Sequence, residues 1–581
     1  MYALLLLLIA SLQLINTRII TVSDHLGDLP DLHQGLSEAQ PGDTIELKSG
    51  FYRNYSYILK SGLYGKPIKI KSAPNAQVYF LNDWDVPDEI CFFEGENIQH
   101  VTIEGPMIFQ DASCAFKLIN SSYIKITNVS IYNMRQQAII MSGFSNVITE
   151  NVIQGCVLEN RETAKRKTSG WNQCLAIWGL PNGQFSSHIT ISRNNISNSY
   201  GEAVYFLNCR YCRAVENNIT NGLFANIYID SSTDIDITKN VLRVNSIEYN
   251  NKNGKACGIA MSPDAYNSIE RIRIENNIII GTRIGIYFFT QHTGGTYNKV
   301  KIYFNTLWNV DYTPLLFKHD QNYTNESETF GCEMKNNFID FAGAVEFEPK
   351  EAWKFASNYF YGTWNVPYIY RDYYDNTSKA DSNLTFDSLF NQISGCENYY
   401  DPNLKPECLR PSPEPGSMQL YHSGTSLGYQ NYSDIYSCTR SAYNPSVGAY
   451  EFPHGCTEEV EPQNITRIYH VTFNITYCTS GYRTLKIMGS YCNWNAARCV
   501  TMNKQKNCVW TDTFYNATSL NFKYKFAEAI QTSLYKIESD PFRTFDGEYL
   551  SYIATNNRTG RYEDCDFETI GDRIILYCSW R

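Results

Sequence analysis

The sequence has no concentration of positive charge. Its 49 Lys and Arg residues are outnumbered by 59 Asp and Glu residues, which gives a formal net charge of -10. The one compact cationic cluster, Lys165, Arg166 and Lys167, is more typical of a solvated loop than of a binding site. Nucleic acid is therefore not an expected partner, because affinity for it depends on basic side chains that neutralise phosphates.

Long hydrophobic runs are missing beyond the N-terminus. Residues 2–15 form an apolar run that is short for a membrane span, and no later run reaches about 18 apolar residues. We expect residues 1–17 to be a secretory signal peptide, although the usual positive charge at its start is absent; an uncleaved anchor is the alternative. The mature protein is then expected to be secreted, extracellular, free of the membrane and monomeric.

Cysteine is plentiful, and its pattern argues for an oxidising compartment. The chain has 18 cysteines, an even number, together with fourteen Asn-x-Ser/Thr sequons. Cys209 and Cys212 form a C-x-x-C motif. Because no second C-x-x-C completes a metal ligand set, the motif favours a structural disulfide over zinc or redox chemistry.

One phrase repeats through the middle of the chain: a short alternating strand, an Asn, an apolar residue, a turn and a second strand. Aligning the Asn before each apolar residue gives Asn195, Asn218, Asn240 and Asn277, at steps of 23, 22 and 37 residues. The same position extends to Asn128, Asn151, Asn305 and Asn337. A period near 22 residues, lengthened by inserted loops, is typical of one turn of a β-solenoid. An ordinary β-sandwich would not fix the phase between Asn and the strands.

An Asn at this position suits a tight bend. Its amide can satisfy local backbone groups, and amides stacked on successive coils can form a ladder. Three ladder positions are also sequons: Asn128, Asn195 and Asn218. Buried in the bend, these three are expected to be poor glycan acceptors. Better acceptors are expected in polar loops, at Asn322, Asn376, Asn383, Asn431 and Asn516.

The N-terminal phrases point to a known class of solenoid. Residues 29–38 are expected to form a short amphipathic helix that covers the open end of the first coil. The phrases AQPGDTIELKSGFY and SGLYGKPIKIKS, and the closing NPSVGAYEF, resemble secreted right-handed parallel β-helix proteins of the pectin-lyase-like, polysaccharide-lyase type. The resemblance implies a right-handed parallel β-helix, a single-stranded solenoid, over residues 18–452. Residues 340–450 are expected to wrap and cap its C-terminal end, with Cys396, Cys408 and Cys438 available for disulfides.

One set of strands is expected to carry a binding face. In this set, the side chains expected to point inward are Ile139, Ile177, Val204, Ile227, Ile259, Ile286 and Leu315. Because side chains alternate between the two faces of a strand, the side chains expected to point outward are Trp178, Tyr205, Tyr228 and Tyr287. Outward rings about 5 Å apart on successive coils would form a platform for stacking sugar rings. The alternative is that inserted loops cover this face and the rings form a second small core.

A ledge of polar residues follows these strands. Its members are Asn208, Asp230, Asp264, Gln291, His292, Lys318, His319 and Asp320, and Glu202 lies at the other end of its strand. A hydrolase needs two carboxylates across the scissile bond, and a lyase needs a base and cations. We therefore take Asp230 and Asp264 as candidate acids, His292 or Lys318 as the candidate base, and Glu202 as substrate-binding. Taken singly, each residue fits the role of a strand-end hydrogen bonder better than that of a catalyst.

No catalytic motif of the known enzymes is present. The chain lacks the G-H-G, R-I-K and paired-Asp phrases of polygalacturonases and the D-D-G-x-D cluster of calcium-dependent pectate lyases. No catalytic residue can therefore be assigned by motif. Calcium is expected only if the protein is a lyase, and no other cofactor or metal is indicated.

The last part of the chain is different. Residues 453–463 form a polar linker, and residues 464–581 contain short alternating strands that predict a small immunoglobulin-like β-sandwich. The phrases VTFNITYCTSGYRTLKIMGSYCNW, VWTDTF, FKYKF and YKIESDPFRTF resemble family-20 starch-binding modules. By position, Trp494 matches the first stacking Trp of that family and Lys525 its Lys. Ile537 replaces the second Trp, which leaves Tyr535 as a substitute ring.

The resemblance implies that the last domain binds an α-glucan; an inert sandwich or one that binds another glycan is the alternative. The whole chain is then expected to be a secreted polysaccharide-binding protein, a carbohydrate-active enzyme of the lyase or glycoside hydrolase type. The alternative is a non-catalytic glycan-binding or adhesion protein. A small sugar-binding domain would raise the effective substrate concentration at a neighbouring site.

Overall fold

The computed structural model describes residues 17–24, 30–53, 56–82, 91–160, 172–246, 256–263, 268–290, 296–319, 329–341 and 353–361, short stretches between 379 and 450, and the strands of the C-terminal part. The predicted signal peptide lies outside the described residues except for Thr17. The chain divides into two compact units, residues 1–456 and 457–581. The division falls inside the segment predicted as a linker.

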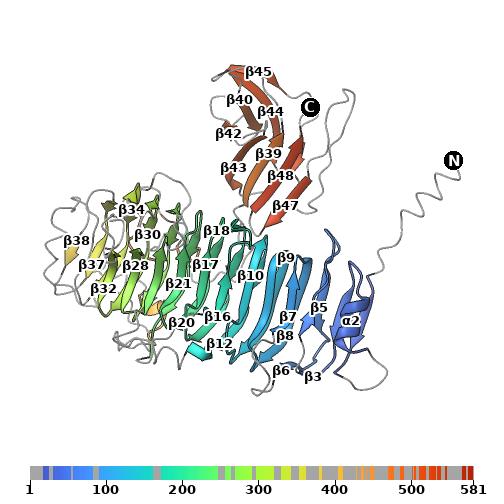
Figure 1. The fold of residues 1–581 in the computed structure, drawn as a ribbon. Helices are drawn as coiled ribbons and strands as arrows, with labels where there is room; N and C mark the ends of the chain where they lie inside the picture. Colours follow the sequence, from blue (N-terminus) through green and yellow to red (C-terminus); the bar gives the residue numbers. More distant parts are fainter. Residues whose placement is uncertain are drawn as a thin grey trace. The chain divides into compact units, whose positions relative to one another are not determined.

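The first unit is a parallel β-helix whose coils each contribute strands to three sheets (Figure 1). The strands of successive coils pair in parallel along every sheet. The first sheet contains β4 (Tyr57–Ile58), β7 (Cys91–Glu96), the start of β9 (Cys114–Tyr132), β10 (Ile139–Phe144), β13 (Leu175–Ile177), β17 (Val204–Leu207), β21 (Ala225–Asp230), β24 (Cys257–Ser262), β28 (Ile284–Thr290) and β32 (Thr313–His319).

The second sheet follows the first along each coil. It contains β1 (Ile19–Val22), β2 (Thr44–Leu47), β5 (Ile68–Ser72), the start of β8 (Gln99–Gln110), the middle of β9, β11 (Val147–Thr149), β15 (Thr190–Ser192), β19 (Arg213–Val215), β22 (Asp236–Thr238), β26 (Arg273–Glu275), β30 (Lys301–Tyr303), β34 (Cys332–Lys335) and β36 (Trp353–Ala356). Short strands lie between the first two sheets: β14 (Ser186–Ser187), β18 (Cys209–Arg210), β25 (Ile269–Glu270), β29 (Tyr297–Asn298) and β33 (Thr329–Phe330).

The third sheet completes each coil. It contains β3 (Gly50–Arg53), β6 (Val78–Leu81), the ends of β8 and β9, β12 (Val152–Cys156), β16 (Asn195–Ser199), β20 (Asn218–Gly222), β23 (Val241–Arg243), β27 (Ile278–Ile280), β31 (Thr306–Val310), β35 (Phe338–Phe341), β37 (Tyr359–Tyr361) and β38 (Lys379–Asp381).

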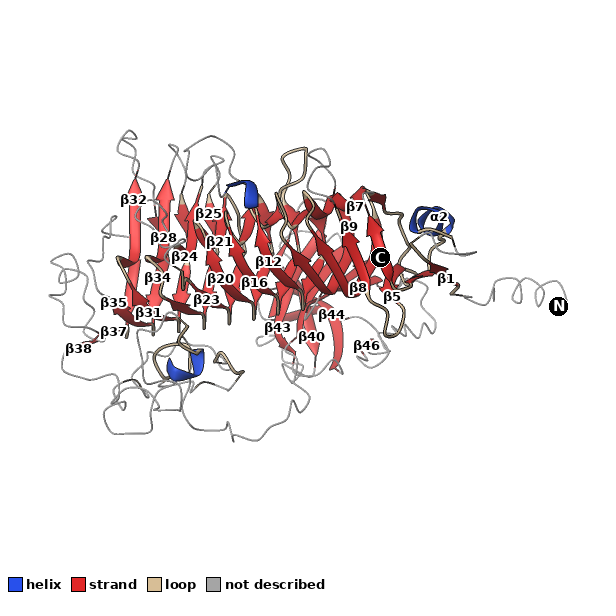
Figure 2. Ribbon diagram, turned by 90° about the horizontal axis from the view of Figure 1, so that it is seen from below, coloured by secondary structure: helices blue, strands red, loops and turns tan. Residues whose placement is uncertain are grey.

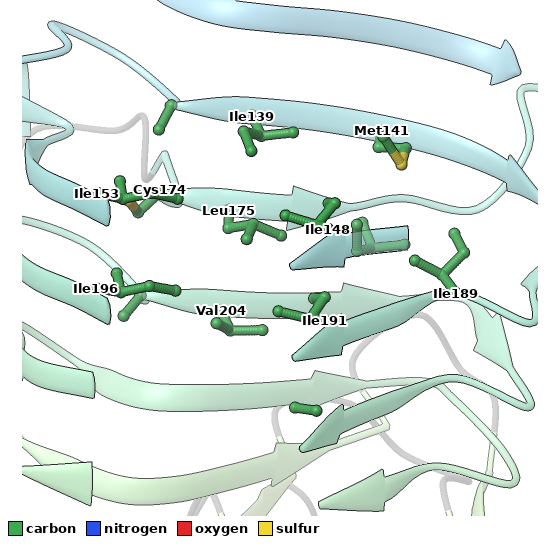
Figure 3. Close-up of a cluster of buried hydrophobic side chains, with 14 of the residues drawn as sticks. Ile139, Met141, Ile148, Ile153, Cys174, Leu175, Ile189, Ile191, Ile196 and Val204 are labelled. Carbon is green, nitrogen blue, oxygen red and sulfur yellow. The ribbon is translucent and has the colours of Figure 1, made fainter. Parts of the chain in front are cut away.

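The interior is filled by the inward side chains of all three sheets. Figure 3 shows Ile139, Leu175 and Val204 of the first sheet stacked across successive coils, with Ile148 and Ile191 of the second sheet facing them. All five are fully buried. Because every coil places its apolar residues at the same points, each coil continues the hydrophobic core of the one before it.

An asparagine ladder runs along the bend between the second and third sheets. Each of seven Asn side chains donates from Nδ2 to Oδ1 of the next ladder Asn at 2.9–3.0 Å. Its members are Asn151, Asn194, Asn217, Asn240, Asn277, Asn305, Asn337 and Asn358. Each is preceded by a residue with φ between 51° and 59°, the left-handed conformation that turns the chain.

The predicted ladder is right at Asn151, Asn240, Asn277, Asn305 and Asn337 and wrong at the other three positions. The bend needs an Asn two residues before the buried Ile or Leu, so Asn194 and Asn217 are in the ladder while Asn195 and Asn218 point outward and are exposed. Asn128 is also exposed, because the backbone N–H of Val129 takes the end position of the ladder. The expectation that these three sequons are buried is therefore wrong.

A helix covers the first coil, as predicted. Helix α2 (Leu32–Glu38) starts after Asp31, whose side chain accepts the backbone N–H of Gln34 at 2.8 Å. Its buried face includes Leu32 and Leu36, and Figure 2 shows the helix at the β1 end of the unit. Gly35 lets it approach closely, since a Cβ there would come within 2.5 Å of Val22.

The described part of residues 403–450 packs on the outer face of the third sheet. Ile278, Trp308 and Phe338 are buried there against residues including Leu404 and Leu409, the latter in the 3₁₀ helix η1 (Pro406–Leu409). Cys408 is disulfide-bonded, as expected for this segment. Its described part thus covers one face of the last coils, where the sequence predicted a cap over their end.

Two further disulfides are described, Cys91–Cys114 and Cys156–Cys174. Cys209 and Cys212, in contrast, are buried free thiols, so the predicted disulfide at the C-x-x-C motif is wrong. Their sulfur atoms lie 3.4 Å from the carbonyl oxygens of Leu207 and Arg210. Burial raises the pKa of the Cys209 thiol, which makes it unreactive.

The second unit contains two small, mostly antiparallel β-sheets. One sheet has the order β42 (Asn503–Lys504), β43 (Val509–Ala517), β39 (Tyr469–Thr476), β48 (Arg573–Ser579) and β47 (Asp566–Ile570). The other has the order β41 (Val500–Thr501), β40 (Thr484–Gly489), β44 (Phe522–Ile530) and β45 (Ser533–Ile537), with β46 (Arg543–Phe545) beside β44. Strands β39 and β48 pair in parallel.

Candidate functional site

The outer face of the first sheet carries the residues that the sequence singled out. Strand pairing places Tyr205 level with Tyr228, and Ala260 level with both Tyr228 and Tyr287. Trp178 is not in this row: Ala176 occupies its place, because Ala176 pairs with Tyr205. The predicted alignment of Ile177 with Val204 is thus wrong by two residues, although Ile177 still points inward.

The rings of this row do not form an open platform. Tyr205, Tyr228 and Tyr287 are only 7%, 6% and 1% exposed. They pack with one another and with Phe289, and the Tyr228 and Phe289 rings stack with centroids 5.7 Å apart. The alternative interpretation, a second small core outside the sheet, is therefore correct. An inserted loop carries no periodic pattern, so the sequence could not decide whether this face was covered.

A second row lies two residues further along the strands. Trp178 is level with Leu207, which pairs with Asp230, and Asp230 pairs with Ser262. Ser262 is level with Phe289, which pairs with Lys318. We call these six residues the Trp178–Lys318 row. It crosses six strands and is roughly 24 Å long at about 4.8 Å per strand. Trp178 and Leu207 are half-buried.

Asp230 is the carboxylate held in this row. It is 5% exposed, and it accepts hydrogen bonds from the Tyr205 hydroxyl at 2.9 Å and from Ser231 Oγ at 2.7 Å. Ser231 adopts a φ of 46°, which marks the bend directly after the strand. These two bonds fix the orientation of the carboxylate.

Glu202 lies in a different place. It is 3% exposed and precedes Leu207 by five residues, which puts its Cα roughly 17 Å from that of Asp230 along extended chain. The paired carboxyl groups of glycosidases are about 5–9.5 Å apart. Glu202 and Asp230 are therefore not such a pair.

Buried polar groups gather near Glu202, and sequence reasoning did not find them. The Gln137 amide donates to Asn172 Oδ1, and Asn160 Nδ2 donates to the Asn172 carbonyl, both at 3.3 Å. A Cβ at Gly201 would come within 2.0 Å of that same carbonyl, which places Glu202 beside the cluster. These residues lie outside the periodic strands, so no repeat in the sequence marks them.

The remaining predicted residues lie wholly or partly outside the described part. Asp264 and His292 are outside it, as is Trp494 of the second unit. The backbone of Lys318 is described in β32, that of Lys525 in β44 opposite Met488, and that of Tyr535 in β45. Strands β44 and β45 are neighbours in one sheet.

The described residues offer no metal centre of the usual kind. Among them, no group of three or more His, Cys, Asp or Glu side chains is placed to hold a metal ion. Asp230 is the one carboxylate of the Trp178–Lys318 row, and the hydroxyl groups of Tyr205 and Ser231 donate to it. We therefore derive no step through calcium. No helix in the described part is long and apolar enough to cross a bilayer.

Comparison with known proteins agrees with the fold. The right-handed β-helix region family matches residues 114–340, which span strands β9 to β35. No curated protein matches the sequence.

Solved structures that match this chain share little sequence with it. An alginate lyase from Paenibacillus sp. strain FPU-7 is 14% identical, with a TM-score of 0.38, and the match covers 54% of this chain and 98% of that one. Pectate lyase Pel9A is 14% identical over 75% and 96%, with a TM-score of 0.43. The catalytic domain of a GH87 α-1,3-glucanase is 11% identical over 59% and 64%, with a TM-score of 0.40. The family match together with the observed coils shows that the first unit is a right-handed parallel β-helix.

Proposed function

We propose that the protein is secreted and acts on a polysaccharide, cutting it as a lyase or a glycoside hydrolase beside the first sheet of the β-helix. The observation that carries this proposal is the Trp178–Lys318 row. It aligns an aromatic ring, a fixed carboxylate and a Lys position over roughly 24 Å, the length of a short oligosaccharide. Sugars are recognised by this combination of a ring face and hydrogen-bonding groups at the edge.

In this proposal Asp230 binds the substrate. Tyr205 and Ser231 hold its carboxylate in one orientation, so it would not have to reorganise when a sugar binds. Asp264 lies two residues beyond Ser262, the partner of Asp230, and is the candidate acid. Lys318, in the row, or His292 is the candidate base. A lyase would use it to remove the proton beside a uronate carboxylate.

The test is a mass-spectrometric product screen of the full chain on neutral and uronic polysaccharides, with and without calcium. A lyase releases products with unsaturated uronate ends, and a hydrolase releases products with new reducing ends. We expect one of these on at least one substrate, and a loss of at least tenfold in kcat/KM in Asp230→Asn and Asp264→Asn. Asn218→Ala, on the third sheet, is the matched control and should keep full activity. No product on any substrate would overturn the enzymatic proposal.

A non-catalytic role in adhesion is the second candidate. It is favoured by the separate second unit, in which the strands that carry Lys525 and Tyr535 are neighbours in one sheet. It predicts that the full chain is retained on starch or glycogen beads without product release. Trp494→Ala should abolish retention, while Trp178→Ala should leave it unchanged. Retention unaffected by Trp494→Ala would contradict this role.

A further inference from the structure

The outer face of the third sheet changes character along the β-helix. From Ile278 onward it carries large apolar residues that are buried against the segment 403–450, namely Ile278, Ile280, Trp308, Phe338 and Tyr359. That cover reaches as far as Arg243 in β23, which donates to the Leu404 carbonyl at 2.8 Å. On the two coils before it, strands β16 and β20 present short polar residues to solvent, beginning with Asn195 and Asn218.

Both strands carry a sequon in extended conformation. In Asn195-Ile196-Ser197, the Asn is exposed, the Ile is fully buried and the Ser is half-buried, as alternation along a strand requires. Asn218-Ile219-Thr220 repeats the pattern on the next coil. The acceptor amide and the hydroxyl that defines the sequon therefore project from the same, outer face.

We propose that Asn195 and Asn218 are N-glycosylation sites, so that a glycan stands on the outer face of the third sheet. The reaction would join C1 of an oligosaccharide to Asn Nδ2. The C1–O bond to a lipid diphosphate donor breaks, the lipid diphosphate leaves, and Nδ2 loses one proton. The fold accommodates the product, because neither side chain is needed in the core and nothing in the described part covers them.

The hydrogen bond between the two amides survives this reaction. Asn218 Nδ2 donates to Asn195 Oδ1 at 3.2 Å. A glycosylated Asn keeps one N–H on Nδ2, which is sufficient for this bond. The buried ladder neighbours could not be modified, since Asn217 Nδ2 uses its two hydrogens for the Ile191 carbonyl and Asn240 Oδ1.

The inference rests on the proposed secretion, and the experiment separates the two. The full chain is secreted from eukaryotic cells once with its own N-terminus and once with a replacement leader. The glycans are then removed by an amidase in H₂¹⁸O, which converts each occupied Asn to ¹⁸O-labelled Asp. Failure of the native N-terminus alone would count against secretion and would leave the glycan test intact in the second sample.

We expect labelled Asp at position 195, at position 218 or at both. Thr220→Ala should remove the label from 218, Ser197→Ala should remove it from 195, and the conservative Thr220→Ser and Ser197→Thr should retain it. If both positions are unlabelled while sequons such as Asn322 and Asn376 are labelled in the same sample, the proposal is overturned.

Discussion

Two rows of asparagine run side by side along the same bend, one residue apart in the sequence, and they differ in almost every physical respect. Asn194 and Asn217 are buried, and their side-chain amides are bonded to backbone and side-chain groups of adjacent coils. Asn195 and Asn218 are exposed and share one hydrogen bond. Residue type alone therefore says little; the distance to the buried Ile decides whether an Asn is part of the scaffold or of the surface.

The largest effect should come from breaking the buried row. Asn217 Oδ1 accepts both the backbone N–H and Nδ2 of Asn194, while its Nδ2 donates to Ile191 and Asn240. Asn217→Ala would leave buried donors and an acceptor unpaired, each costing about 1–3 kcal/mol. We expect the free energy of unfolding to fall by on the order of 4 kcal/mol, measured by chemical denaturation. A loss below about 1 kcal/mol would show that the ladder is not a main stabilising feature.

A buried carboxyl group on the third sheet should make the stability of the fold depend on pH. Asp340 is 7% exposed, and burial raises its pKa to about 7 although the backbone N–H of Asn309 donates to it. Because its pKa is lower in the unfolded chain, the folded state binds more protons between about pH 4 and 7. Stability from this group is therefore fully present below pH 4 and lost as the pH rises to 7.

Asp340→Asn should remove that pH dependence. We expect the variant to be more stable than the parent above pH 7, by on the order of 3 kcal/mol, and the difference to shrink toward pH 4. Thermal unfolding followed from pH 4 to 8 measures it. An equal difference at every pH would mean that Asp340 does not titrate in this range.

These contrasts also show what the sequence could and could not predict. The 22-residue phrase, the inward Ile and Val positions and the N-terminal helix follow from periodicity and were predicted. The choice between Asn194 and Asn195 could not be predicted, because the two residues stand together directly before Ile196. Only the stacking of whole coils shows which of them is buried. The burial of Tyr228 and Tyr287 in one cluster with Phe289 could not be predicted, because the period of the strands does not say which outward residues are exposed. Asp230 was singled out because it ends a periodic strand, and its role stays a prediction.

A smaller effect is expected at Tyr205, whose hydroxyl donates to buried Asp230. Tyr205→Phe keeps the ring in its cluster and removes one hydrogen bond to a carboxylate, which should cost about 1.5–3 kcal/mol. If Asp230 binds substrate, the variant should also raise KM more than it lowers kcat. Tyr287→Phe is a matched control for the loss of a hydroxyl in the same cluster. Identical values of kcat and KM for the parent and Tyr205→Phe would mean that Asp230 does not bind the substrate.

The smallest effect is expected when a residue of the exposed Asn row is changed. Asn218→Ala removes an exposed side chain and the single bond to Asn195, so the free energy of unfolding should change by less than about 0.5 kcal/mol. Parent and variant must both be deglycosylated first, since the variant also loses a sequon. Chemical denaturation of Asn218→Ala and Asn217→Ala then compares the stability lost at two consecutive Asn positions at the start of the same strand. Equal losses of stability at both positions would mean that the bend depends on both amides. The exposed row would then stabilise the fold as much as the buried row does.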